Sequence, residues 1–193
     1  MLTTHWLPAA RLNINQARNF SLLSTHASFP ATMYRYQLAR KATLYDVTQD
    51  ETRHRKDAIT VSKDGLVHAA ITKSSPYSNG PIFMPNSRLM QQMLRFDFER
   101  YLEEIGDGKS VLDPTVFCVP RGTPIPSALV LWREGVSRFS LQPSSPMEIE
   151  KLNDVLSEFY EKSATVVGAE EWIEKHPYRE SFADQNENEW MEV

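Results

Sequence analysis

An arginine stands in the middle of a strand-like segment near the start of the chain, "ATMYRYQLARK". Side chains alternate between the two faces of a strand, so Arg35 and Gln37 share one face. The later segment "SRFSLQP" repeats this pattern, because Arg138, Ser140 and Gln142 share a face. A guanidinium group matches the oxygens of a phosphate. The two strand faces could therefore converge on a phosphate-bearing ligand.

A polar loop between these strands adds further hydrogen-bonding groups. The stretch "SSPYSNGP" supplies Ser74, Ser75, Tyr77, Ser78 and Asn79. It is too polar for the core and too long for a simple turn, and loops of this kind often carry binding sites. The alternative is that both arginine-bearing strand faces are the solvent faces of an amphipathic sheet, in which case Arg35 is ordinary surface.

Several common chemistries find little support in the sequence. The five histidines are scattered, with no pair at metal-binding spacing. There is no phosphate-binding glycine loop and no serine nucleophile elbow. The single cysteine, Cys118, lies in the apolar segment "TVFCVP", where we interpret it as a small buried hydrophobic residue. A lone cysteine is also typical of a reducing compartment.

Strands and helices that position these residues follow one another without a repeated βα unit. Strands are expected at 32–39, on both sides of an Asp64-Gly65 turn, and in "TVFCVP", "SALVLWRE" and "SRFSLQP". The residues 46–58 are expected to form a polar loop. Because strands and helices are segregated along the chain, the fold class is predicted to be α+β.

Two long helices are predicted. The first covers 86–106, with Asn86 or Ser87 as its cap and Gly106 at its end. Its apolar stripe, which we expect to face the core, consists of Leu89, Met90, Met93, Leu94, Tyr101, Leu102 and Ile105. The second opens with "SPME", where Ser145 and Glu148 form a capping box around Pro146. A short helix in "GAEEWIEKH" is expected to end the fold at Pro177.

Composition and charge set apart the two ends of the 193-residue chain. The protein has an ordinary apolar fraction of 41% and a net charge of −4, which does not favour nucleic acid as a partner. No run is long and apolar enough for a membrane span. The basic, acid-free residues 1–30 are predicted to be an arm or a mitochondrial targeting segment, and 178–193 an acidic tail. The folded domain then covers 31–177, in the cytoplasm unless the targeting segment operates.

The order of several short motifs resembles the toxin family of the second type VI secretion exported effector. They are a strand with Tyr34-Arg35, the turn Asp64-Gly65-Leu66, the pair Ile82-Phe83, the run "VPRGTPIP" and the run "PSSPM". The family is described as ADP-ribosyltransferase-like and NAD-dependent. The resemblance spans residues 34–147 and implies a split β-sheet core with flanking helices around an NAD cleft.

The same resemblance implies a function and a set of site residues. The protein would be a transferase of the glycosyltransferase class that uses NAD as substrate, modifies an unknown macromolecular target and arrests growth. Arg35 and Arg138 would act in catalysis. The residues that would bind NAD are Arg35, Tyr77, Ser78, Asn79, Ser140 and Gln142. An immunity or inhibitor protein is a further expected partner. The alternative is a catalytically degenerate interaction module on the same fold.

This chain departs from the family pattern at several positions. Gly80-Pro81 replaces a Thr-Ser pair, Arg138 replaces a histidine, and Ser140 replaces a threonine. Many transferases of this class also use a carboxylate to stabilise the ribose cation that forms as nicotinamide leaves. No carboxylate lies on the 138–142 strand face, and Glu134 is assigned to the preceding turn.

Overall fold

The computed structural model describes residues 24–38, 40–49, 58–70 and 78–177. Strands and helices are segregated in it, which confirms the α+β class. The strands are β1 (Ser24–His26), β2 (Met33–Gln37), β3 (Tyr45–Asp46), β4 (Ala58–Ile59), β5 (Ile82–Phe83), β6 (Thr115–Val119), β7 (Leu129–Arg133), β8 (Phe139–Pro143) and β9 (Thr165–Gly168). The helices are α2 (Arg88–Gly106), α3 (Ile149–Ser163) and α4 (Ala169–Lys175). None of the helices in these ranges could cross a bilayer.

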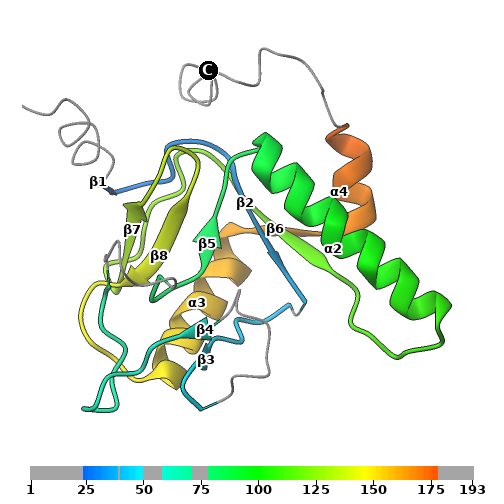
Figure 1. Cartoon of the computed structure of the whole chain (residues 1–193). Helices are drawn as coiled ribbons and strands as arrows, with labels where there is room; N and C mark the ends of the chain where they lie inside the picture. Colours follow the sequence, from blue (N-terminus) through cyan, green and yellow to red (C-terminus); the bar gives the residue numbers. More distant parts are fainter. Residues whose placement is uncertain (1–23, 39, 50–57, 71–77, 178–193) are drawn as a thin grey trace, which may run out of the picture.

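The main strands form two antiparallel sheets that meet at one point. The first has the order β1-β7-β8-β5 and the second the order β2-β6-β9, while β3 and β4 form a small parallel pair. A single bridge joins the sheets, because the backbones of Tyr34 and Met84 exchange hydrogen bonds of 2.7 and 3.0 Å. Beyond this bridge β2 and β5 diverge (Figure 1). The arrangement is the split β-sheet that the family resemblance implied.

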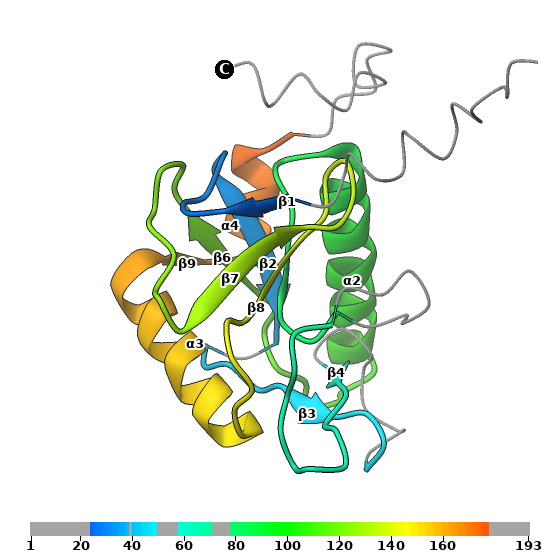
Figure 2. The same ribbon diagram turned by 90° about the vertical axis from the view of Figure 1, so that its left-hand side faces the viewer.

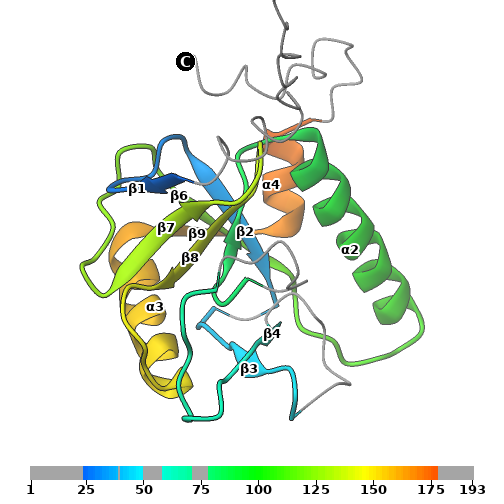
Figure 3. The same cartoon turned by 60° about the vertical axis from the view of Figure 1, so that its left-hand side comes forward.

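The helices cover opposite sides of the strands, α3 on one side and α2 on the other (Figures 2 and 3). One apolar core lies against α3, around Leu152, Leu156 and Phe159. A second core lies between the β2-β6-β9 sheet, α2 and α4, around Met90, Leu94 and Trp172. Burial of these apolar side chains is the main term that holds the two sheets in place.

Helix α2 begins and ends as predicted, but its apolar stripe is only partly buried. The Ser87 hydroxyl caps the helix by accepting a hydrogen bond from the Met90 amide. Met90 and Leu94 are buried. The expectation that the whole stripe faces the core is wrong for four residues, which are exposed: Leu89, Met93, Leu102 and Ile105. Leu89 and Met93 border a cleft, so they are exposed although they belong to the apolar stripe.

Helix α3 starts three residues later than predicted. Its N-cap is Glu148, without a side-chain capping bond, and Ser145 lies outside the helix. The reason is a tertiary pairing, because the backbone of Met147 exchanges hydrogen bonds of 2.8 and 3.3 Å with Val67. This pairing keeps the chain extended where the local sequence favours a helix. The turn at Asp64-Gly65 is as expected, with a left-handed φ of 79° at Gly65.

Candidate active site

A cleft of about 390 Å³ opens where β2 and β5 diverge beneath α2. Pockets that bind small molecules in proteins are of this order of size. Its polar end contains Arg35, Ser78 and Arg138. Its apolar wall is formed by Ile82, Met84, Leu89, Met90, Met93 and Leu94. The cleft therefore combines a cationic end with a water-excluding wall.

Arg35 is buried, with only 4% of its surface exposed, although it lines the cleft. Its Nε donates a 3.0 Å hydrogen bond to Oε1 of Gln37, and the Gln37 amide in turn donates to the Lys41 carbonyl oxygen at 3.2 Å. The interpretation of Arg35 as ordinary surface is therefore wrong. Burial of a guanidinium group costs free energy unless it is hydrogen-bonded, and Gln37 supplies such a hydrogen bond to Arg35.

Glu134 connects the residues around the cationic end of the cleft. Its Oε2 accepts from the Ser78 hydroxyl at 2.6 Å and lies 3.3 Å from Nε of Arg138. Its Oε1 accepts from the Ser140 hydroxyl and, at 3.2 Å, from the Gln142 amide. The Glu134 side chain is only 15% exposed. The Glu134 carboxylate thus holds the two cleft residues Ser78 and Arg138 in position by a hydrogen bond and a salt bridge.

Two buried amides hold the segments that lead into the site. The Gln142 side chain accepts from the Ala70 amide at 2.8 Å and donates to the Ala70 carbonyl oxygen at 3.2 Å. The Asn79 side chain accepts from the Thr60 amide at 3.0 Å and donates to the carbonyl oxygens of Thr60 and His68 at 3.2 and 2.8 Å. These bonds satisfy backbone groups that the irregular segments would otherwise leave without partners.

Gly80 lies too close to β8 to carry a side chain. A Cβ atom at this position would be 2.1 Å from the carbonyl oxygen of Leu141. The contact persists because the Leu141 amide donates to the Pro81 carbonyl oxygen at 3.0 Å and keeps the two backbones together. The conformation of Gly80 is ordinary, so close approach alone requires a glycine here.

Comparison with protein-family models identifies the family of this chain. The model of the Tse2 ADP-ribosyltransferase toxin matches residues 31–172, which is most of the chain. The protein belongs to the Tse2 ADP-ribosyltransferase toxin family. Searches of curated proteins and of solved structures gave no significant match. Family membership makes the protein an ADP-ribosyltransferase toxin, and it fits the split sheet described above.

The site residues expected from the Tse2 family resemblance fall into two groups. Arg35, Ser78 and Arg138 meet in the cleft. Three others lie behind its wall and bind protein groups instead, namely Asn79, Ser140 and Gln142. Tyr77 lies outside the described residues. Where this Tse2-family chain lacks a Thr-Ser pair, at Gly80-Pro81, the backbone of β8 occupies the space of the missing side chain.

Glu134 lies in the turn between β7 and β8, as assigned, but its side chain bonds residues on the β8 face. Glu134 directly follows β7, and its backbone amide donates a hydrogen bond of 2.9 Å to the Arg138 carbonyl oxygen. Trp132 pairs with Ser140 across the hairpin, so the alternation of side chains places Glu134 on the same face as Ser140 and Gln142. The hairpin register, had it been derived from the "REGV" turn, would have identified this carboxylate.

Tyr34 borders the cleft and forms a small cluster with α4. The ring of His176 stacks on Trp172 with a centroid distance of 4.2 Å. Nδ1 of His176 lies 2.8 Å from the Trp172 carbonyl oxygen, which can only accept, so Nδ1 carries the proton. Nε2 then accepts from the Tyr34 hydroxyl at 3.3 Å. Burial raises the pKa of Tyr34, and nearby Cys118 raises it further, so Tyr34 is a neutral donor at physiological pH.

Cys118 is half-buried, not fully buried as expected from its apolar segment. Burial raises the pKa of its thiol to about 11, so the reactive thiolate is scarce at physiological pH. No group of three metal-binding side chains occurs within the ranges that the structure describes. The polar groups gathered at and behind the cationic end of the cleft include the two arginines, the Ser78 hydroxyl and the Glu134 carboxylate.

Proposed function

We propose that the cleft under α2 binds NAD as a substrate and that the protein transfers its ADP-ribosyl group to a macromolecular target, with growth arrest as the result. The observation that carries this proposal is the buried Arg35 at the polar end of a cleft whose other wall is apolar. Guanidinium groups bind phosphate oxygens with two parallel hydrogen bonds. Arg35 and Arg138 would hold the diphosphate, and the apolar wall would accommodate a ring of the dinucleotide.

The proposed reaction exchanges one bond at the ribose. The bond between ribose C1′ and the nicotinamide nitrogen breaks, and its electron pair leaves with nicotinamide. A nucleophile of the target then bonds to C1′ and releases its proton to water. Positive charge develops on the ribose in between, and a nearby negative charge stabilises it. Glu134 supplies that charge one hydrogen bond behind the cleft wall, through Ser78.

The test compares purified wild-type protein with Arg35→Ala and Arg35→Lys by calorimetry with NAD. Loss of charged hydrogen bonds to a phosphate costs about 1.5–3 kcal/mol, so Arg35→Ala should weaken NAD binding about tenfold or more. Arg35→Lys keeps the charge without the planar fork and should fall between the two. Because Arg35 is buried, each variant is first shown to be folded by its near-ultraviolet circular dichroism.

A matched control is Arg121→Ala, which removes an exposed arginine in the turn after β6. It should bind NAD like the wild type. The proposal fails if the folded Arg35→Ala protein binds NAD unchanged, or if the wild type does not bind it at millimolar concentration. Expression of the same variants in a sensitive host, scored by growth, tests the link to toxicity.

Partners and location follow from the same proposal. A toxin that uses NAD needs a macromolecular acceptor and, in the cell that makes it, an immunity or inhibitor protein. We place its action in the cytoplasm, with mitochondria as the alternative if residues 1–30 direct it there. Imaging of a fluorescent protein fused to residues 1–30 distinguishes the two, since a diffuse signal removes the mitochondrial alternative.

A further inference from the structure

Ser78 has the hydrogen-bond geometry of an activated nucleophile. Its hydroxyl donates to Oε2 of Glu134 at 2.6 Å, a distance typical of a hydroxyl group bonded to a carboxylate. Nη2 of Arg138 donates to the same hydroxyl oxygen at 3.4 Å. A neighbouring carboxylate can take up the proton of a hydroxyl group, and a guanidinium group stabilises negative charge that develops on the oxygen. A nucleophile, a base and a charge-stabilising group therefore lie within hydrogen-bond distance of one another.

The base of this group is held in place by residues outside the lining of the cleft. The Ser140 hydroxyl and the Gln142 side-chain amide both donate to Oε1 of Glu134, and both residues are fully buried. Their hydrogen bonds leave Oε2 of Glu134 for Ser78 and Arg138. A base that is oriented by further hydrogen bonds is typical of sites that activate a hydroxyl nucleophile.

Ser78 can be reached from the cleft, whereas Ser140 cannot. Ser78 lines the cleft together with Arg35 and Arg138, while Ser140 has no exposed surface. A serine hydroxyl has one proton and two lone pairs. Among the described residues, the proton of Ser78 is bonded to Glu134 and one lone pair to Arg138. The second lone pair is therefore left for a bond to a molecule in the cleft.

We propose that Ser78 is a modification site, at which the protein attaches the ADP-ribosyl group of NAD to its own chain. This inference rests on the proposed function, because NAD supplies the group. The bond between ribose C1′ and the nicotinamide nitrogen breaks, and its electron pair leaves with nicotinamide. Oγ of Ser78 bonds to C1′, and its proton passes to Oε2 of Glu134 and from there to water. The products are free nicotinamide and a glycosidic bond between Ser78 and ADP-ribose.

The proposed position of NAD brings a ribose close to this hydroxyl. Arg35 and Arg138 would hold the diphosphate, the nicotinamide ribose is attached directly to the diphosphate, and Ser78 lies at the same polar end of the cleft. A ribose that loses nicotinamide is a strong electrophile, so the hydroxyl needs to release its proton only as the new bond forms. ADP-ribose on Ser78 would occupy the polar end of the cleft and block a second NAD. The reaction should therefore stop after one modification per molecule.

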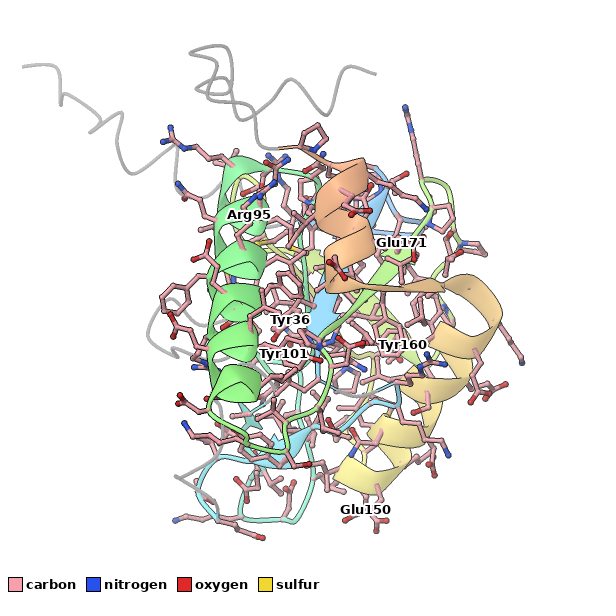
Figure 4. The ribbon with its side chains drawn as sticks, turned by 90° about the vertical axis from the view of Figure 1, so that its right-hand side faces the viewer. Tyr36, Arg95, Tyr101, Glu150, Tyr160 and Glu171 are labelled. Atoms are coloured by element: carbon pink, nitrogen blue, oxygen red, sulfur yellow. The ribbon has the colours of Figure 1, made fainter. Side chains whose placement is uncertain are left out.

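Two tyrosine hydroxyl groups at the cleft are competing acceptors. Tyr34 lines the cleft, but its hydroxyl donates to the neutral imidazole of His176 at 3.3 Å. Tyr36 borders both the cleft and a second cavity of about 210 Å³, whose lining includes Tyr101 (Figure 4). The structure favours Ser78 over both, because its hydroxyl is bonded to a carboxylate at the cationic end of the cleft. Mapping of the modified residue distinguishes the three.

The test is incubation of the purified full-length protein with NAD and without any other protein. Mass spectrometry of the intact chain should show a gain of one ADP-ribosyl group, and fragmentation of its peptides should place the group on Ser78. The first-order rate constant should stay the same when the protein is diluted, because NAD and its acceptor share one cleft. Ser78→Ala should slow the modification about a hundredfold or more, the factor that a positioned base contributes. Ser78→Thr keeps a hydroxyl and should restore part of the rate.

The matched control is Ser137→Ala, which removes a buried serine hydroxyl from the hairpin turn that contains Glu134. This variant should be modified like the wild type. Near-ultraviolet circular dichroism shows that each variant is folded. Hydroxylamine distinguishes the proposed adduct from an ester on Glu134, because it cleaves esters and leaves a glycosidic bond to serine intact.

The outcomes separate this proposal from the proposed function. The proposal is overturned by an adduct on another residue, by an adduct that hydroxylamine removes, or by a rate constant that rises with protein concentration. Unchanged modification of folded Ser78→Ala overturns it as well. NAD binding in calorimetry without any adduct overturns the proposal and leaves the proposed function intact. A wild type that neither binds NAD nor is modified refutes both.

Discussion

The replacement Glu134→Gln is the sharpest test of the site as described. It keeps the shape of the side chain but leaves one acceptor oxygen where there were two. The carboxylate accepts from Ser78 and Arg138 on one oxygen and from Ser140 and Gln142 on the other. Whichever way the new amide is oriented, its NH₂ group faces donors. Arg138 cannot accept a hydrogen bond at all.

The magnitude follows from which bonds are lost. A hydrogen bond to a charged group contributes about 1.5–3 kcal/mol when buried, while a half-exposed pair such as Glu134–Arg138 contributes less than about 1 kcal/mol. We therefore expect Glu134→Gln to lower the free energy of unfolding by about 2–3 kcal/mol. For a chain of this length that is a decrease in Tm of roughly 4–12 °C. NAD binding should weaken as well, because Ser78 and Arg138 lose their support.

Stability is measured by urea unfolding followed by circular dichroism, and NAD binding by calorimetry. The control is Glu161→Gln on the exposed face of α3, which should change the free energy of unfolding by less than about 0.5 kcal/mol. If Glu134→Gln is as stable as this control and binds NAD equally well, the hydrogen bonds of Glu134 support neither the fold nor NAD binding.

Three further predictions concern Gly80 and Cys118. Gly80→Ala should lower the free energy of unfolding by about 3 kcal/mol or more, because its Cβ would lie 2.1 Å from the Leu141 oxygen. The control is Gly168→Ala, where the added Cβ meets nothing within 4 Å. Equal unfolding curves for the two variants would contradict the close approach at Gly80. Alkylation of Cys118 at pH 8 should be about a hundredfold slower than that of a free cysteine, since burial raises the thiol pKa to about 11. Because the thiol pKa is higher in the folded protein, the free energy of unfolding should be highest below the unfolded pKa of the thiol, near 9, and should decrease towards pH 11. A free energy of unfolding that does not change over this range, or fast alkylation, would show the thiol to be accessible.

The parts of the fold that could be predicted are those with local signals. Helix α2 was predicted from its cap at Ser87 and its terminal glycine, and the strands β6, β7 and β8 from their β-branched residues between prolines and glycines. The start of α3 could not be predicted, because Met147 pairs with Val67, eighty residues away in the chain. Tertiary hydrogen bonds of this kind override a local capping motif.

The structure brings Arg35, Ser78 and Arg138 together in one cleft, but the sequence did not predict how they are held there. Residue types alone left Arg35 and Arg138 either as binding groups or as solvent-exposed side chains, and it was the family resemblance that indicated binding. They did not show that Gln142 and Ser140 turn towards protein groups, because alternation along a strand gives the face of a side chain and not what covers it. Once β8 is covered, its polar face becomes the support of the site.

Two of the departures from the family pattern, at Arg138 and Gly80, lie close to the hydrogen bonds of Glu134. Arg138 in place of a histidine brings a permanent charge, which a carboxylate must balance, and the hairpin supplies Glu134 for it. That carboxylate then also binds Ser78, whose hydroxyl lies in the cleft two residues before Gly80, where a side chain has no room. Arg138, Glu134 and Ser78 contact one another in three pairs, so replacement of any one of them removes two of these three contacts.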